Sequence, residues 1–137
     1  MWKYLEGITE ADIAVEVKGK NFEELLENII SAFFEISTSQ NSKSVKMPQI
    51  RQIILEGKSE KDFVIALIDE LIFLKDTKGL AFPKGKFNKC KSGYKAVLLG
   101  GPIGEYGQGI DVKALSYHHL EVEKTSKGWR AVLVFDV

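Results

Sequence analysis

The sequence predicts an α+β fold: two amphipathic helices packed on a mixed, mainly antiparallel sheet, in a single domain spanning residues 1–137. Two long segments repeat apolar residues at helical spacing, and about seven shorter ones have the alternation or β-branched bulk of strands. Short glycine-containing turns join some of the strands. A chain of 137 residues with 45% hydrophobic residues is large enough to build one core.

The N-terminal part predicts a short strand followed by a longer one. Residues 1–6 contain Trp2 and Tyr4 and predict an edge strand or an anchored arm. In residues 13–18, apolar side chains alternate with mostly polar ones, which predicts a half-buried strand that ends at Gly19.

The first helix is predicted after Asn21. Asn21 can cap the helix while Glu24, three residues later, completes a capping box. The aromatic residues of its apolar face are interpreted as core packing and not as a ligand site. The face consists of Leu25, Ile29, Phe33 and Ile36, widened by Phe22, Leu26, Ile30 and Phe34.

The second helix is predicted between Ser59, its N-cap, and Gly79. A polar loop over residues 38–46 and an extended segment over residues 45–56 precede it. Asp69 and Glu70 occur within this helix, where acidic residues usually lie on the solvated face. The apolar residues of this second helix are Phe63, Val64, Leu67, Ile68, Leu71, Ile72 and Leu74.

A lysine-rich hairpin is predicted next, with strands at residues 82–90 and 94–99. Its lysines have two interpretations, solvated strand edges that discourage aggregation or a basic surface that faces RNA or an acidic partner. The glycine-rich residues 100–109 lack the ending of a phosphate-binding P-loop and predict a flexible loop near a site or partner surface. The lysines of the predicted hairpin are Lys84, Lys86, Lys89, Lys91 and Lys95.

The C-terminal part predicts three more strands. Residues 110–117 form the first, and a tight turn at residues 125–128 separates the other two. The last strand is apolar on both faces and ends in Asp136. This carboxylate must lie at the rim in water or be held by a partner, because burying it alone is costly.

Composition limits the function and the location. Nineteen basic and nineteen acidic residues cancel, which argues against a free-standing RNA-binding protein. The single Cys90 cannot form an internal disulfide, and the sequence contains neither a signal peptide nor an apolar run of transmembrane length. We therefore expect a cytoplasmic protein without membrane contact.

Three separated motifs resemble the archease family. They are Ala11-Asp12-Ile13, then Val112-Lys113-Ala114-Leu115-Ser116-Tyr117-His118, then Gly128-Trp129-Arg130-Ala131 continuing through Phe135-Asp136-Val137. The segment Glu70-Leu71-Ile72-Phe73-Leu74 is also similar to a segment typical of archeases. The resemblance covers nearly the whole chain in order and spacing.

The resemblance implies an accessory protein, not an enzyme, that activates an RtcB-type RNA ligase in tRNA splicing. It implies metal binding by Asp12, Asp136 and Val137, the last through a main-chain oxygen or a terminal carboxylate. Lys113, His118 and Glu70 are implied as functional or partner-contact residues, although a structural role for His118 stays open. RNA contact is expected to be indirect, through the ligase.

The residues themselves also suggest a cation site. Asp12 and Asp136 each lie at the end of a predicted strand and would meet if the two strands are neighbours. A divalent cation would relieve their repulsion, and Ca²⁺ accepts carboxylate, carbonyl and water oxygens with flexible geometry. Thr9 occupies the position where many archeases have histidine, which leaves an oxygen-only site to which Glu10 could add a ligand.

Two other functions fit the same residues. A small metal-dependent phosphoester hydrolase would use the acids to hold an ion that activates water, with His118 as the only obvious base. A chaperone-like or purely structural module would tolerate Asp136→Asn without loss of function.

Overall fold

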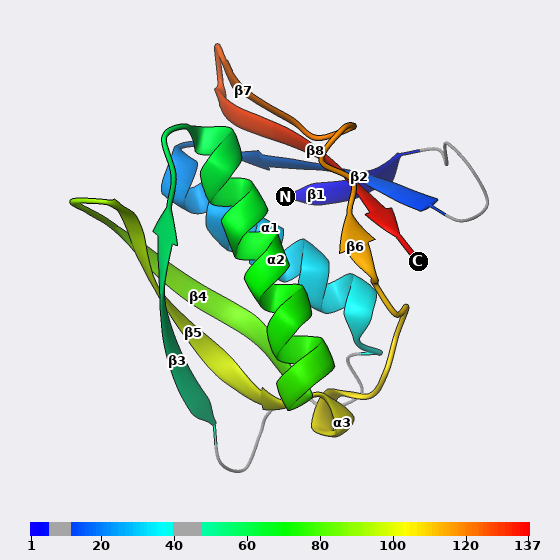
Figure 1. Ribbon diagram of the computed structural model, residues 1–137. Helices are drawn as coiled ribbons and strands as arrows, with labels where there is room; N and C mark the ends of the chain where they lie inside the picture. The colour runs from blue at the N-terminus through cyan, green and yellow to red at the C-terminus, as the bar shows by residue number, and fades with distance from the viewer. Residues whose placement is uncertain (6–11, 40–47) are drawn as a thin grey trace.

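The computed structural model describes residues 1–5, 12–39 and 48–137, which form two antiparallel sheets and three helices (Figure 1). The elements are β1 (Trp2–Leu5), β2 (Asp12–Gly19), α1 (Phe22–Ser37), β3 (Gln49–Glu56), α2 (Glu60–Lys78), β4 (Leu80–Cys90), β5 (Gly93–Pro102), α3 (Ile103–Tyr106), β6 (Ala114–Leu115), β7 (Glu121–Thr125) and β8 (Gly128–Asp136).

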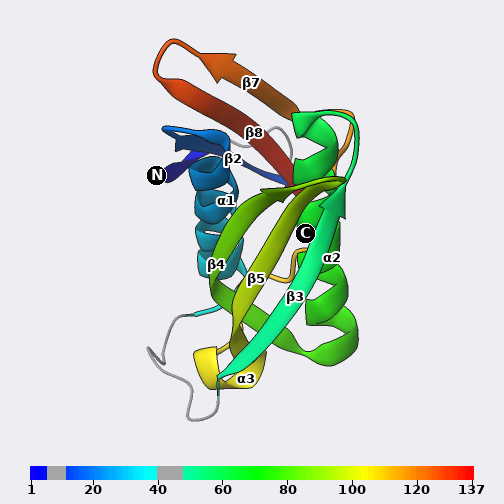
Figure 2. The ribbon, with the colours of Figure 1, turned by 90° about the vertical axis from the view of Figure 1, so that its left-hand side faces the viewer.

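The strands divide between the two sheets. The five-stranded sheet has the order β1-β2-β8-β6, with β7 also paired to β8, and the three-stranded sheet has the order β3-β5-β4. The predicted α+β class is confirmed, but the strands do not form the one sheet that was expected. Helices α1 and α2 contact strands of both sheets and occupy the space between them (Figures 1 and 2).

Capping residues set where both long helices begin, as predicted. The Asn21 side chain accepts from the Glu24 amide at 2.8 Å, and the Glu24 carboxylate accepts from the Lys20 amide at 3.1 Å. At α2, the Ser59 hydroxyl accepts from the Asp62 amide at 3.2 Å. Gly79 ends α2 with φ 63°, in the left-handed conformation that favours glycine.

The predicted apolar stripes form the core. All seven apolar residues predicted for α2 are buried, and so are those predicted for α1 except the half-buried Phe34. At one end of the core, Phe22 packs edge-on against Trp129 at 5.2 Å, and its ring is tilted against that of Tyr94 at 5.4 Å. The aromatic cluster thus joins α1 to strands of both sheets.

Tyr94 should make stability fall at alkaline pH. Burial, helped by a 3.0 Å hydrogen bond that its hydroxyl donates to Glu23, raises the pKa of Tyr94 to about 12. Because an unfolded tyrosine titrates near pH 10, this contribution is complete below about pH 10 and lost as the pH rises toward 12. Urea unfolding should show a loss of about 1–2 kcal/mol between pH 9 and 11.5.

Two variants test this prediction. Tyr94→Phe should remove most of the alkaline loss, whereas Tyr4→Phe, which alters an exposed ring, should retain it. An unchanged pH profile for Tyr94→Phe would show that another group is responsible.

Two predicted elements differ in the structure. The glycine-rich segment is not simply a flexible loop, because β5 continues to Pro102 and α3 follows, with Tyr106 buried against Phe34 at 4.9 Å. Position 100 of β5 requires glycine, because a Cβ there would come within 2.0 Å of the Ala81 carbonyl oxygen. The strand predicted over residues 110–117 is only Ala114–Leu115.

Candidate functional site

The two predicted metal ligands from opposite ends of the chain face each other. Asp12 is the first residue of β2 and Asp136 the last of β8, and they are direct partners in the antiparallel ladder. Direct partners point to the same face of a sheet, with Cβ atoms about 5 Å apart. One cation can therefore reach both carboxylates.

Burial of β8 places Asp136 at the rim. Residues 131–135 are all buried, whereas Asp136 is exposed, as the cost of burying a lone carboxylate requires. On the other side of β8, Asp136 pairs with Ala114 of β6. The small alanine side chain leaves this side of the carboxylate accessible.

Lys113 is held beside this pair by its backbone. Its amide donates to the Asp136 carbonyl oxygen at 2.8 Å, and its side chain is exposed. The Lys113 ammonium also helps to lower the pKa of Asp111, after the larger effect of the hydrogen bond from Lys75. The structure thus brings Asp12, Asp136 and Lys113 together at one end of the five-stranded sheet (Figure 1).

The other predicted contact residues lie elsewhere. Glu70 is half-buried on α2, and its neighbour Asp69 is the residue that contacts the segment after β6, by accepting from the Tyr117 hydroxyl. This hydrogen bond raises the pKa of Tyr117.

His118 lies in a turn that follows β6. Its ring meets that of His119 edge-on at 5.2 Å, and Nδ1 of His119 is 2.8 Å from the Ser116 hydroxyl oxygen. Because the chain turns here, the rings of these two adjacent histidines come together.

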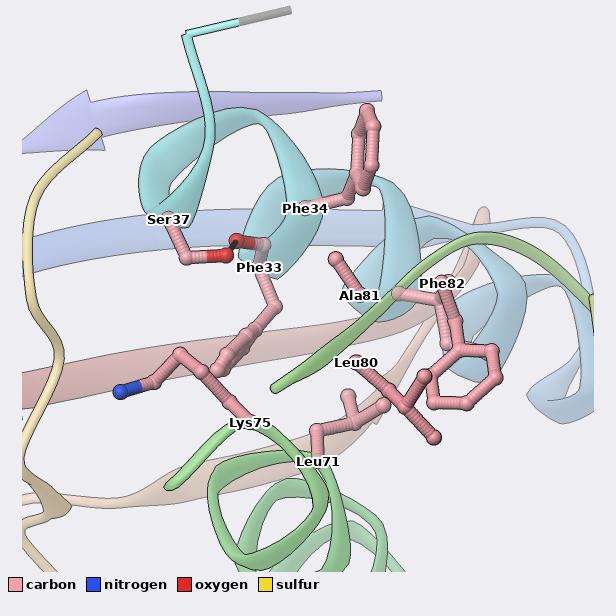
Figure 3. Close-up of a pocket in the computed structure, with 9 residues that line it drawn as sticks. Phe33, Phe34, Ser37, Leu71, Lys75, Leu80, Ala81 and Phe82 are labelled. Atoms are coloured by element: carbon pink, nitrogen blue, oxygen red, sulfur yellow. Dashed lines mark hydrogen bonds between the residues drawn. The ribbon is translucent and has the colours of Figure 1, made fainter. Parts of the chain in front are cut away.

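A lysine of α2 that the sequence did not single out, with a side chain only 9% exposed, anchors the loop before Lys113. Lys75 of α2 donates to Asp76 at 2.6 Å and to Asp111 at 2.8 Å. Burial lowers its pKa, but the hydrogen bonds to the two carboxylates outweigh this and the net shift is upward. Figure 3 shows its ammonium pointing away from the apolar Leu71 and Leu80. The pocket beside it, of about 10 Å³, holds one water at most.

A charged cluster lies on the same sheet face as the two aspartates. Arg130 donates from Nε to Glu16 at 2.6 Å and from Nη1 to Glu123 at 3.1 Å. The hydrogen bond from Arg130 holds the pKa of Glu16 below its usual range. In the register, Ala14 and Val134 separate this cluster from the aspartates.

The donor set fits a hard divalent cation that keeps part of its water shell. Within residues 1–5, 12–39 and 48–137, no group of three or more His, Cys, Asp or Glu side chains could hold a metal ion. The Val137 side chain has no donor atom and packs against the core, so a main-chain oxygen or a terminal carboxylate would have to serve there. Thr9 and Glu10 lie outside the described residues. Carboxylate, main-chain and water oxygens are ligands that Ca²⁺ accepts.

Comparisons with known proteins agree along nearly the whole chain. The model of the Archease protein family (MTH1598/TM1083) matches residues 2–137. The chain is 29% identical to Protein archease of Pyrococcus abyssi, over 99% of this chain and 98% of that protein. It is 33% identical to Protein archease of Archaeoglobus fulgidus, over 93% of each.

Two solved structures share the fold. The solution structure of Methanobacterium thermoautotrophicum protein 1598 has a TM-score of 0.74 at 21% identity and covers 99% of this chain and 98% of that one. The crystal structure of TM1083 from Thermotoga maritima, described as an archease and possible chaperone, has a TM-score of 0.68 at 24% identity over 97% of each chain. Among the described helices we find no candidate for a membrane-spanning segment.

Proposed function

Because this chain belongs to the archease protein family, we propose that it is an accessory protein that activates an RtcB-type RNA ligase in tRNA splicing. It would promote guanylylation of the ligase and its multiple turnover without being an enzyme itself. The observation that carries this proposal is the direct pairing of Asp12 with Asp136, beside the backbone of Lys113.

In this proposal, Asp12 and Asp136 hold a divalent cation, Ca²⁺ in the first instance, with a main-chain oxygen of Val137 as a further ligand. Asp12 and Asp136 would hold a bound cation with their charges balanced by it, and its remaining coordination positions would be open to water or to oxygen ligands of the partner. The protein residues contribute a rigid position, since both aspartates are at the ends of paired strands.

The same end of the sheet supports contact with a partner. Asp136 and Lys113 are exposed, and the loop before Lys113 is tied to α2 through Lys75 and Asp111. The Lys113 ammonium would then pair with an acidic or phosphate group of the ligase site at little entropic cost to the backbone. His118, exposed in the turn after β6, and the half-buried Glu70 of α2 would add partner contacts apart from this site.

The test combines the purified protein with its cognate ligase, GTP and a divalent metal. We expect faster formation of guanylylated ligase, and ligation that proceeds through many turnovers per ligase molecule. Hydrolysis of a phosphoester substrate by the isolated protein is measured in parallel. If stoichiometric amounts leave guanylylation unchanged, the proposal fails.

A lysine variant locates the contact. Lys113→Ala should lose the stimulation but fold normally, because the structural contact of Lys113 is made by its backbone amide. Lys124→Ala, which removes an exposed lysine of β7, is the matched control and should stimulate like the parent. Equal stimulation by both variants would contradict the assignment of Lys113.

A further inference from the structure

The three-stranded sheet has an outer face that no described element covers. Its inner face packs on the helices through buried residues such as Leu55, Ala96 and Leu98. Side chains alternate along a strand, so their neighbours point away from the helices. The outward residues form three cross-strand rows: Ile50, Leu99 and Lys84; Gln52, Val97 and Lys86; Ile54, Lys95 and Asn88.

Aliphatic side chains make up much of this outer face. Ile50 is 68% exposed, Ile54 50% and Leu99 39%. Exposed aliphatic residues that gather on one face usually mark an interaction site, whereas single ones need no explanation. In Figure 2 the three strands lie in front of α1 and α2, so this face of the sheet points away from both helices.

The same outer face carries lysines that form none of the ion pairs seen among the described residues. Lys84, Lys86 and Lys95 are exposed, and none of the ion pairs among the described residues includes them. Residues 77–104 contain six lysines and no acidic residue, although the whole chain has no net charge. Glu56, at the end of β3, is the one acidic residue among the outward positions of the described strands of this sheet.

We propose that this outer face of β3, β5 and β4 binds single-stranded RNA, with Lys84, Lys86 and Lys95 on the phosphates and the aliphatic residues against the bases. This surface is separate from the Asp12 and Asp136 site, since the helices lie between the two sheets. The proposal goes beyond RNA contact through the ligase and does not depend on ligase activation.

Geometry favours a single strand over a duplex. The three strands make a surface about 10 Å wide, and lysines two residues apart on β4 lie about 7 Å from each other. The major groove of an RNA duplex is deep and narrow, so side chains on a flat three-stranded face cannot reach its bases. Unstacked bases can lie on an open sheet. Since the outer face has no aromatic residue, binding should be weak and independent of sequence.

The experiment measures fluorescence anisotropy of a labelled 20-nucleotide oligouridine at salt concentrations from 50 to 200 mM. The parent should bind, with log Kd rising linearly with log salt. Lys84→Gln/Lys86→Gln/Lys95→Gln should bind more weakly and reduce that slope by about 2, since each lost phosphate contact accounts for about 0.7. Ile54→Gln should raise Kd about fivefold through lost apolar burial, with the slope unchanged.

Controls separate RNA recognition from general attraction of anions. Lys61→Gln/Lys124→Gln/Lys127→Gln removes the same charge from exposed positions elsewhere and should leave the affinity and the slope near those of the parent. The proposal is overturned if the parent does not bind at 50 mM salt, or if both triple variants behave alike. It is also overturned if poly-L-glutamate competes equally at matched charge, which would assign the face to an acidic protein.

Discussion

Ca²⁺ is expected to stabilise the parent protein but not the Asp136→Asn variant. A ligand that binds only the folded state adds about 2.7 kcal/mol at one hundred times its Kd. Asn at position 136 removes one of the two carboxylates that are paired in the register. The cation is then attracted by one carboxylate instead of two and should bind much more weakly. The free energy of unfolding is measured by urea titration in EDTA and in Ca²⁺, and metal binding by calorimetry.

The EDTA arm separates loss of metal from loss of folding. Without metal, Asp136→Asn should be at least as stable as the parent, because like charges directly opposite one another destabilise a sheet. Glu121→Gln, which removes an exposed carboxylate from β7, is the matched control and should keep the full response to Ca²⁺. Equal stabilisation of all three proteins by Ca²⁺ would rule out the metal site.

Phe135→Ala is expected to destabilise the protein by about 4 kcal/mol. Phe135 is 1% exposed and packs edge-on against Phe33 of α1 at 6.1 Å. Its removal leaves a cavity between β8 and α1, which rigid neighbours fill only in part. Urea unfolding at neutral pH measures the loss.

An apolar residue that is exposed instead of buried provides the control for the loss of stability. Ile50→Ala removes a side chain that is 68% exposed, so its effect on stability should be within about 0.5 kcal/mol. If Phe135→Ala also cost less than about 1 kcal/mol, the edge-on packing of Phe135 on Phe33 would not be a major source of stability.

Local rules were enough for the secondary structure where chemistry and periodicity agree. Asn21 and Ser59 cap their helices as predicted, because each places an oxygen within reach of an amide three residues later. Gly79 ends α2 because its left-handed conformation is open to glycine. The turn at Thr125 and Gly128 likewise joins β7 and β8.

Elements that depend on distant packing were not predicted. Gly100 appeared to belong to a flexible loop, but β4 approaches β5 so closely that only glycine fits at this position of the strand. Tyr106 gave no periodic pattern, yet its burial against Phe34 fixes α3. Lys75 and Asp111, 36 residues apart, form an ion pair that no local sequence pattern predicts.

The sequence alone determined which side chains could form the site: a carboxylate at each of two strand ends, and a lysine in the motif between them. Only the tertiary structure decided that they meet. Strand pairing joins residues over a hundred positions apart, and a shift of one residue between β2 and β8 would turn Asp12 and Asp136 to opposite faces. The one-sided pattern of β2, with Val15 and Val17 in the core and Glu16 bonded to Arg130 on the opposite face, selects the register in which the two carboxylates share a face.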